Sequence, residues 1–529
     1  MLLAVVVSRV IGRVTRLPVP LLQIALGAAL FYSSLSSVTL DPDVFFLLLL
    51  PPLLFLDGWR IPKDDLLREA PTIVTLALGL VVFTVLGIGL LIHAMIPAMP
   101  LAVAFALAAV ISPTDPIAVT AIAGRTPIPI RMRRVLEGES LFNDASGLVC
   151  MRFAVAAALT GSFALSSALL SFLWVALGGL AIGTAVTWLI TRARPSAAVL
   201  LGDDGGAQIL VTLLIPFGVY LLAERLGCSG ILAAVAAGIT MGFSPHSHWQ
   251  ATTRIRRTAV WDTVQFAANG SIFVLLGEQI PAILMDARQT VQLTGHQNPW
   301  WLGLYVMLIV AALALLRFVW VWAAMTVAFF GEPSHRMMST SARWRVMLAM
   351  SIAGVRGAIT LAAVLTLPLK LGDGSPFPGR DLAIFLAAGV IVLSLLLATL
   401  ALPRALSGLE LPADKSSADE EGPARRAGAE AALRALESAQ EGHAGIDLQT
   451  QAVAQISTMY RQRIERYSGH QEAALHGGKA DDVERSLRLL ALRAEREEIL
   501  RMGQLHGIQE ITLRKLVREI DLQEARYSV

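Results

Sequence analysis

The stretch AVISPTDPIAV, residues 109–119, breaks a long apolar run with two prolines and one aspartate. A proline inside a helix removes a backbone donor and clashes with the preceding turn, so Pro113 and Pro116 predict an interrupted helix. In a membrane, such an interruption is tolerated only where it is buried in protein or lines a cavity. The freed carbonyls and the Asp115 carboxylate are hard oxygen ligands, which suit a small cation. A structural kink is the plainer alternative, although a kink does not require the aspartate.

The surrounding sequence is typical of a protein with many membrane spans. It has 529 residues, of which 55% are hydrophobic and only 16% are charged, whereas soluble proteins carry roughly a quarter charged residues. Residues 1–404 form a series of long apolar runs, and a membrane-spanning helix needs about 20 apolar residues. We predict an all-α polytopic fold of about thirteen transmembrane helices, at about 1–12, 18–34, 43–56, 71–92, 100–122, 135–159, 165–191, 207–224, 229–243, 261–285, 301–330, 346–369 and 381–403,.

Basic residues are distributed unequally between the two sets of connecting loops. Lysine and arginine collect in the cytoplasmic loops of membrane proteins. The basic set comprises the loops at 13–16, 60–68, 125–134, 192–194, 254–257 and 336–345, whereas the opposite set holds Arg225, Arg288, Lys370 and Arg380. We therefore expect the basic loops and the segment after residue 404 on the cytoplasmic side of the cell membrane.

A second polar segment, GESLFNDASG at 138–147, precedes the apolar run LVCMRFAVAAAL. Residues four apart share a face of a helix, so Ser140 lies with Asp144, and Glu139 lies with Asn143. The first pair forms an oxygen-rich face that suits a cation, and the second suits bracing against another helix. The alternative is a purely structural arrangement in which the aspartate is solvated in a crevice.

The segment SIAGVRGAIT, residues 351–360, places Arg356 between two glycines of the twelfth helix and predicts a second interruption. Arg356 is the natural cationic partner for a buried Glu139. Within two sets of six helices, with the seventh as a connector, the fifth and twelfth helices occupy equivalent positions. Paired interruptions in corresponding positions indicate a transporter with inverted repeats and a site near the bilayer midplane.

Two further arginines lie within apolar runs. Arg317 is expected to pair with Glu278 or with another buried acid. Arg152, two turns beyond Asp144, is expected either to line an outer vestibule or to snorkel towards the interface,. The two cysteines of the chain predict neither a disulfide framework nor a zinc site,.

Four segments, in this order, resemble the signature segments of monovalent cation/proton antiporters of the sodium–proton exchanger type, and most of all the bacterial members with a long cytoplasmic C-terminal region. They are ISPTDPIAV, GESLFNDASGLV, IFVLLGEQI and SIAGVRGAITLAAVLTLP. PPLLFLDGWRIPK at 51–63 resembles the third-helix segment of that family. The resemblance covers residues 1–404 and implies a thirteen-helix fold and a homodimer. It also implies exchange by an elevator-like movement of a core domain against a dimerisation domain.

The resemblance also implies roles for individual residues. Asp144 would carry the proton and bind the cation. The other groups around Na⁺ or K⁺ would be Asp115, the main chain of Thr114, and Ser140. Glu139 with Arg356 would form a stabilising bridge, and Asn143 is typical of an electroneutral branch, since related electrogenic exchangers have Asp there. No cofactor is expected besides the transported Na⁺ or K⁺ and H⁺.

The segment after residue 404 is charged and polar throughout. Residues 405–425 have the composition of a linker, and residues 426–529 are expected to form a helical cytoplasmic domain. Its helices are predicted at about 426–442, 446–468, 480–502 and 505–526. Such a domain is either a solvated bundle or dimer contact, or a regulatory domain that senses pH or a partner.

These features predict a secondary transporter that exchanges a monovalent cation, foremost Na⁺ but also K⁺ or Li⁺, for H⁺, and not an enzyme. One alternative is a K⁺/H⁺ antiporter regulated by its tail. A cation channel would need a filter-like ring of carbonyls, and an intramembrane aspartyl protease would need a Gly-x-Gly-Asp element. Leu371-Gly372-Asp373 lacks the first glycine. The net charge of +3, with no basic cluster interleaved with aromatics, argues against nucleic acid as a partner.

Overall fold

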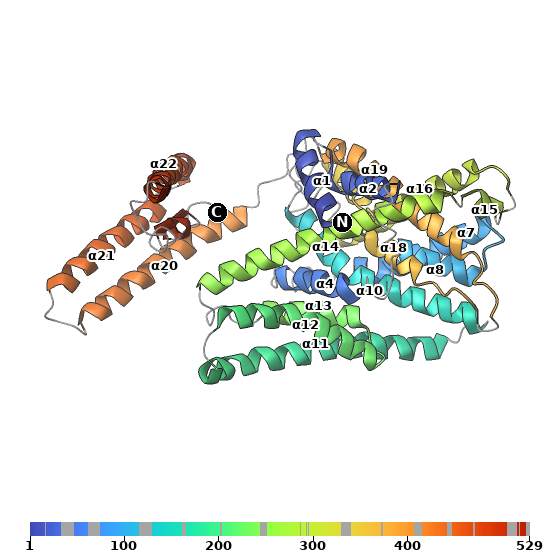
Figure 1. Cartoon of the computed structure of the whole chain (residues 1–529), viewed down its shortest axis with the longest axis horizontal. Helices are drawn as coiled ribbons and strands as arrows, with labels where there is room; N and C mark the ends of the chain where they lie inside the picture. The colour runs from blue at the N-terminus through green and yellow to red at the C-terminus, as the bar shows by residue number, and fades with distance from the viewer. Residues whose placement is uncertain are drawn as a thin grey trace. The chain divides into compact units, whose positions relative to one another are not determined.

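The computed structural model describes most of the chain. The described residues are 1–15, 17–32, 47–61, 75–115, 130–160, 165–201, 204–243, 251–285, 287–292, 294, 296–329, 340–371, 374–406, 415–441, 447–468, 471–504, 516–517 and 519–524. Within them the regular elements are helices, apart from one isolated bridge between Lys370 and Pro376. The chain divides into two compact units, Met1–Glu410 and Leu411–Val529 (Figure 1).

The first unit is a bundle of apolar helices. Its elements are α1 (Leu2–Thr15), α2 (Val19–Tyr32), α4 (Leu50–Arg60), the π-helix η1 (Thr75–Leu80), α7 (Val81–Met95), α8 (Leu101–Ile111), α10 (Ile130–Thr160), α11 (Leu165–Leu201), α12 (Gly205–Arg225), α13 (Gly230–Gly242), α14 (Ala251–Met285), α15 (Ala287–Gln292), α16 (Trp300–Phe329), α17 (Thr340–Ile352), α18 (Ala358–Leu365) and α19 (Arg380–Leu406). Among the described residues, 7 helices are long and apolar enough to cross a membrane. The predicted all-helical, multi-pass membrane architecture is therefore confirmed.

Several helices extend beyond the apolar runs that predicted them. α14 begins at Ala251, although the predicted span begins at residue 261, and α11 continues to Leu201, beyond residue 191. The added turns of α14 carry polar and charged residues such as those of TTRIRR, 252–257. Hydropathy marks only the part of a helix that lies in hydrocarbon, whereas backbone hydrogen bonds continue into the polar region.

Both predicted interruptions lie in the first unit. α8 ends at Ile111 and residues 112–115 are not helical, while residues 116–122 of the predicted span lie outside the described residues. The predicted helix at 346–369 is two helices, α17 and α18, separated by residues 353–357. Gly357, the N-cap residue of α18, has extended backbone angles, so the second helix begins at Ala358.

Helix contacts divide the first unit into two tightly packed groups. In the α13 group, α13 packs against α4, α11 and α12, and Figure 1 shows α11, α12 and α13 side by side. In the site group, η1, α7, α8, α10, α16, α17, α18 and α19 pack against one another. The groups meet sparsely, because α10 makes few contacts with α4 and α13. α14 packs against α2 and α1, and it touches both groups.

Glycines set the closest approaches between helices. Gly58 and Gly238 let α4 and α13 approach until a Cβ on either glycine would meet backbone of the other helix. Gly27 and Gly277 do the same for α2 and α14. Small residues at such crossings allow close van der Waals packing between membrane helices, which accounts for the extensive contact in these pairs.

The second unit is helical and polar. Its helices are α20 (Lys415–Glu441), α21 (Asp447–Ser468) and α22 (Gln471–Gln504). α20 packs against α21, and it begins inside the segment 405–425 that was predicted to be a linker. Residues 415–425 include lysine, alanine, glutamate and arginine, which favour helix even where composition suggests a linker. Arg496 on α22 forms ion pairs with Asp521, at 2.9 Å, and with Glu524.

Candidate ion-binding site

The candidate site lies where the end of α8 meets the break between α17 and α18. The backbone N–H of Asp115 donates a 2.7 Å hydrogen bond to the carbonyl of Val355, which joins the two non-helical segments. Gly357 lies directly against the Asp115 carboxylate, because a Cβ at Gly357 would overlap Oδ2. The Asp115 carboxylate therefore lies beside the N-terminus of α18, the end that carries positive partial charge.

Arg356 stabilises the helix ends that meet at this crossing. Its Nε donates a 2.9 Å hydrogen bond to the carbonyl of Ile111, the last residue of α8, and its Nη1 donates to the carbonyl of Gly354, just beyond α17. Helix C-termini carry negative partial charge and unsatisfied carbonyls. The buried guanidinium of Arg356 therefore donates hydrogen bonds to carbonyls at the C-terminal ends of both α8 and α17.

The predicted ion pair between Glu139 and Arg356 is wrong. Glu139 pairs with Arg317 of α16, whose Nη1 and Nη2 lie 2.5 and 2.7 Å from the two carboxylate oxygens. The Nε of Arg317 donates to the carbonyl of Met350 at 2.9 Å, and the missing side chain of Gly354 leaves room for it. The spacing of residues on one helix defines a face but does not identify the neighbouring helix that supplies the cation. Arg356 is also unsuited to the pairing, because carbonyls already accept its N–H groups.

A chain of hydrogen bonds connects this ion pair to the end of α8. Thr114 Oγ1 donates to Glu139 Oε1 at 3.2 Å, and Asn143 Nδ2 donates to Thr114 Oγ1 at 3.0 Å. All three side chains are buried. Asn143 Oδ1 has no hydrogen-bond partner among the described residues. The shared face of Glu139 and Asn143 thus braces α10, as its spacing predicts, but through Thr114 and Arg317.

Asp144 lies on the neighbouring face of α10, together with Ser140. Both are buried, and Asp144 retains 7% exposure. One turn further along, Gly147 lets α10 pack against the end of α8, since a Cβ there would overlap the ring of Pro113. This close approach places Asp144 beside the interrupted segment that carries Asp115.

Three carboxyl groups share the site. Asp115 and Asp57 of α4 lie near enough to Asp144 for their negative charges to repel its ionised form. Among the described residues, no arginine or lysine forms an ion pair with Asp144. Like charges in a low-dielectric site repel strongly, so a bound cation or proton relieves this repulsion. Sequence reasoning missed Asp57, although a lone aspartate inside the apolar run LLFLDGW was the available signal.

The structure also places the two other arginines. Of the partners expected for Arg317, Glu278 or another buried acid, the structure shows the second, because Arg317 pairs with the buried Glu139. Arg152 lines a pocket and pairs with Glu224 of α12 at 3.3 Å. The ion pair with Glu224 is a contact that neither of the two roles expected for Arg152 includes, and the outer position of this pocket stays a prediction.

A buried aspartate with two half-buried aspartates near it, at a crossing of interrupted helices inside a multi-pass bundle, is typical of an ion-coupled secondary transporter,. Comparisons with known proteins agree with this class. Residues 1–408 match the family described as sodium/hydrogen exchanger, transmembrane. The chain belongs to this sodium/hydrogen exchanger family. It is a transporter of monovalent cations and protons and not an enzyme.

Two relatives and one solved structure illustrate the similarity. The chain is 40% identical over 533 residues to the "Uncharacterized Na(+)/H(+) exchanger YjcE" of Escherichia coli, covering 99% of this chain and 97% of that protein. It is 42% identical over 408 residues to the "Sodium, potassium, lithium and rubidium/H(+) antiporter" of Bacillus subtilis, covering 76% and 60%. The sodium proton antiporter MjNhaP1 of Methanocaldococcus jannaschii has the same fold, with a TM-score of 0.57, 21% identity, and coverage of 77% of this chain and 97% of that one.

Proposed function

We propose that this protein exchanges Na⁺, and also K⁺ or Li⁺, for H⁺ by competition of the two ions at Asp144. One observation carries the proposal. Asp144 is buried near Asp115, and among the described residues no cationic side chain forms an ion pair with Asp144. A group that is occupied by either ion, but never by both, gives exchange without any further coupling device.

The coupling follows from the cost of moving a bare charge. An ionised carboxylate in hydrocarbon costs at least about 2.5–3.5 kcal/mol, so Asp144 moves only when a proton or a cation neutralises it. Each half-cycle then carries the same charge. Exchange is therefore electroneutral and indifferent to membrane voltage, in keeping with asparagine at position 143.

The cation is held by hard oxygen ligands. Asp144, Asp115 and Ser140 supply side-chain oxygens, and Thr114 supplies its main chain, because its hydroxyl is engaged with Glu139 and Asn143. Oxygen ligands suit hard cations, and the alkali ions carry the same charge and differ in size. The name of the Bacillus subtilis relative, which includes sodium, potassium, lithium and rubidium, supports a broad alkali-cation range.

The proposal includes the placement of the chain. Residues 1–404 form the antiporter domain, a homodimer with thirteen spans in two inverted six-helix repeats, and the segment after residue 404 lies in the cytoplasm. Supporting features are the clustering of basic residues in one set of loops and the corresponding interruptions after α8 and between α17 and α18.

Reconstituted exchange measured with each alkali ion, at several pH values and imposed voltages, tests the function. Asp144→Asn is expected to abolish exchange, whereas Asp381→Asn, which neutralises an aspartate with 76% side-chain exposure, is expected to leave it unchanged. Persistent exchange in Asp144→Asn would remove Asp144 from its role. Exchange that depends on voltage would refute electroneutrality.

A further inference from the structure

We propose that the ion pair between Arg152 and Glu224 is a gate that closes one end of the ion path. This inference rests on the proposed function, because it takes Asp144 as the ion-binding residue. In the state described by the structure the gate is closed, and it opens once in each transport cycle. By the distribution of basic residues, this end of the path is the outer one.

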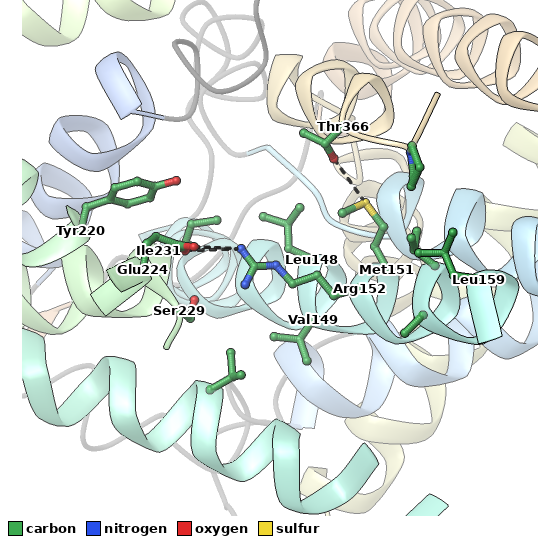
Figure 2. Close-up of a pocket in the computed structure, with 14 residues that line it drawn as sticks. Leu148, Val149, Met151, Arg152, Leu159, Tyr220, Glu224, Ser229, Ile231 and Thr366 are labelled. Atoms are coloured by element: carbon green, nitrogen blue, oxygen red, sulfur yellow. Dashed lines mark hydrogen bonds and ion pairs between the residues drawn. The ribbon is translucent and has the colours of Figure 1, made fainter. Parts of the chain in front are cut away.

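The ion pair bridges the two tightly packed helix groups. Arg152 belongs to α10 of the site group, and Glu224 belongs to α12 of the α13 group. Arg152 Nη2 lies 3.3 and 3.4 Å from the two carboxylate oxygens of Glu224, and Figure 2 shows the guanidinium reaching from α10 across the pocket to Glu224. Contacts between α10 and the α13 group are otherwise sparse. A displacement between the groups must therefore break this pair.

A pocket of about 400 Å³ surrounds the pair. Its walls come from both groups, with α10 and the end of α18 on one side and residues of α11, α12 and α13 on the other. Among the lining residues are Leu148, Arg152, Leu159, Tyr220, Glu224 and Thr366. Leu148 lies one helical turn beyond Asp144 on α10. The pocket thus begins one turn beyond Asp144 and extends along α10 away from the arginine-rich first turn of that helix.

Glu224 is the fixed member of the pair. Its Oε1 accepts a 3.0 Å hydrogen bond from the backbone N–H of Gly230, the first residue of α13, where the positive helix end favours a carboxylate. The turn between α12 and α13 contains Gly227 with φ 68°, a conformation that side chains other than glycine rarely adopt. This tight turn holds Glu224 on the α13 group, so that Arg152 is the member that leaves.

The exposure of the pair suits a contact that opens repeatedly. The side chains of Arg152 and Glu224 are 52% and 33% exposed, and ion pairs in such positions change an equilibrium only about two- to fivefold. Glu139 and Arg317, with side-chain exposures of 1% and 3%, form the contrasting case of a permanent pair within one helix group. The pair of Arg152 and Glu224 therefore shifts the equilibrium between the closed and open states of the gate without preventing its opening.

Single and double substitutions separate gating from simple attraction of the cation. Weakening a gate favours the state open to the pocket, so Arg152→Ala and Glu224→Ala should both lower the apparent KM for a cation supplied on the pocket side, by about two- to fivefold. They should raise the KM on the opposite side. If the two charges acted only on the approaching cation, the two substitutions would change the KM in opposite directions, because one removes a positive charge and the other a negative charge.

The experiment uses the full-length protein in vesicles of known orientation, with initial exchange rates measured from each side. The double variant Arg152→Ala/Glu224→Ala should match the single variants. Arg225→Ala, which removes a neighbouring exposed arginine, is the control and should have no effect. Additive single effects, opposite signs, or equal changes on both sides would overturn the gate.

A cross-link tests the requirement for opening directly. The variant Arg152→Cys/Glu224→Cys, in a background with Cys150→Ala and Cys228→Ala, should be cross-linked by a short bifunctional reagent that forms a disulfide with each of the two thiols. Exchange should then stop until a reductant cleaves these disulfides. Undiminished exchange by the cross-linked protein would overturn the proposal. Asp144→Asn in the same vesicles reports on the proposed function separately, since exchange by that variant refutes the ion site whatever the gate does.

Discussion

Glu139 of α10 and Arg317 of α16 form a two-point ion pair in which both side chains are almost completely buried. The pair fixes the position of α10, and through Thr114 and Asn143 it also fixes the end of α8. The helix that carries Asp144 is thereby connected to the non-helical segment that carries Asp115.

Removing either member of that pair should destabilise the fold. Glu139→Ala leaves Arg317 as an uncompensated buried charge, and such losses typically cost 3–5 kcal/mol. We expect a lower folded yield and a lower unfolding temperature in detergent, with a similar result for Arg317→Ala. Arg426→Ala breaks an exposed pair with Glu430 and should change stability by about 1 kcal/mol or less. Normal stability of Glu139→Ala would contradict the bracing role.

Enlarging Gly357 should weaken cation binding without unfolding the protein. A methyl group there overlaps the Asp115 carboxylate, so Gly357→Ala is expected to displace Asp115 and to raise the apparent KM for Na⁺ about tenfold, equivalent to about 1.4 kcal/mol. Gly303→Ala adds the same methyl group where nothing lies within 4 Å, and its KM should stay unchanged. Equal KM values for the two variants would show that Asp115 takes no part in cation binding.

Competition at one carboxylate predicts a specific dependence on pH. Mass action requires the apparent KM for the cation to rise by about tenfold for each unit of decreasing pH once protons occupy most sites. The maximal rate at saturating cation on the same side should not fall in parallel. Initial rates measured at fixed opposite-side pH provide the test, and a KM independent of pH would mean that proton and cation occupy separate sites.

Truncation after residue 410 separates the two compact units and tests the role of the polar one. We expect exchange to persist and the fraction of dimer in detergent to fall, as measured by light scattering. Within α22, the hydrogen bond from Arg501 holds the pKa of Glu498 below its usual value, so this pair stays charged at neutral pH and is no sensor there. A shifted pH profile after truncation would support the regulatory alternative, and unchanged assembly and pH profile would argue against both roles.

Sequence periodicity predicts the part of this site that lies on one helix. The i,i+4 spacing separates the faces of α10 correctly, because helical geometry alone determines which of residues 139–144 point together. The prolines and glycines also mark the interruptions after α8 and after α17, because these residues limit or relax the backbone itself. The faces of α10 and the two interruptions could therefore be predicted without tertiary information.

Pairings between helices could not be predicted in the same way. Both Arg317 and Arg356 are single arginines in apolar runs, and either could satisfy a buried glutamate. What distinguishes them is local geometry: Arg356 lies in the break itself, where carbonyls of Ile111 and Gly354 accept its N–H groups, whereas Gly354 opens a path for Arg317. That distinction depends on packing between elements far apart in the chain.

Asp57 belongs to α4 of the α13 group, whereas Asp144 and Asp115 belong to segments of the site group. A relative displacement of the two groups would change the distance from Asp57 to the other two carboxylates, and with it the electrostatic potential at the site. The affinity of the protein for its cation would then differ between the states that such a displacement connects.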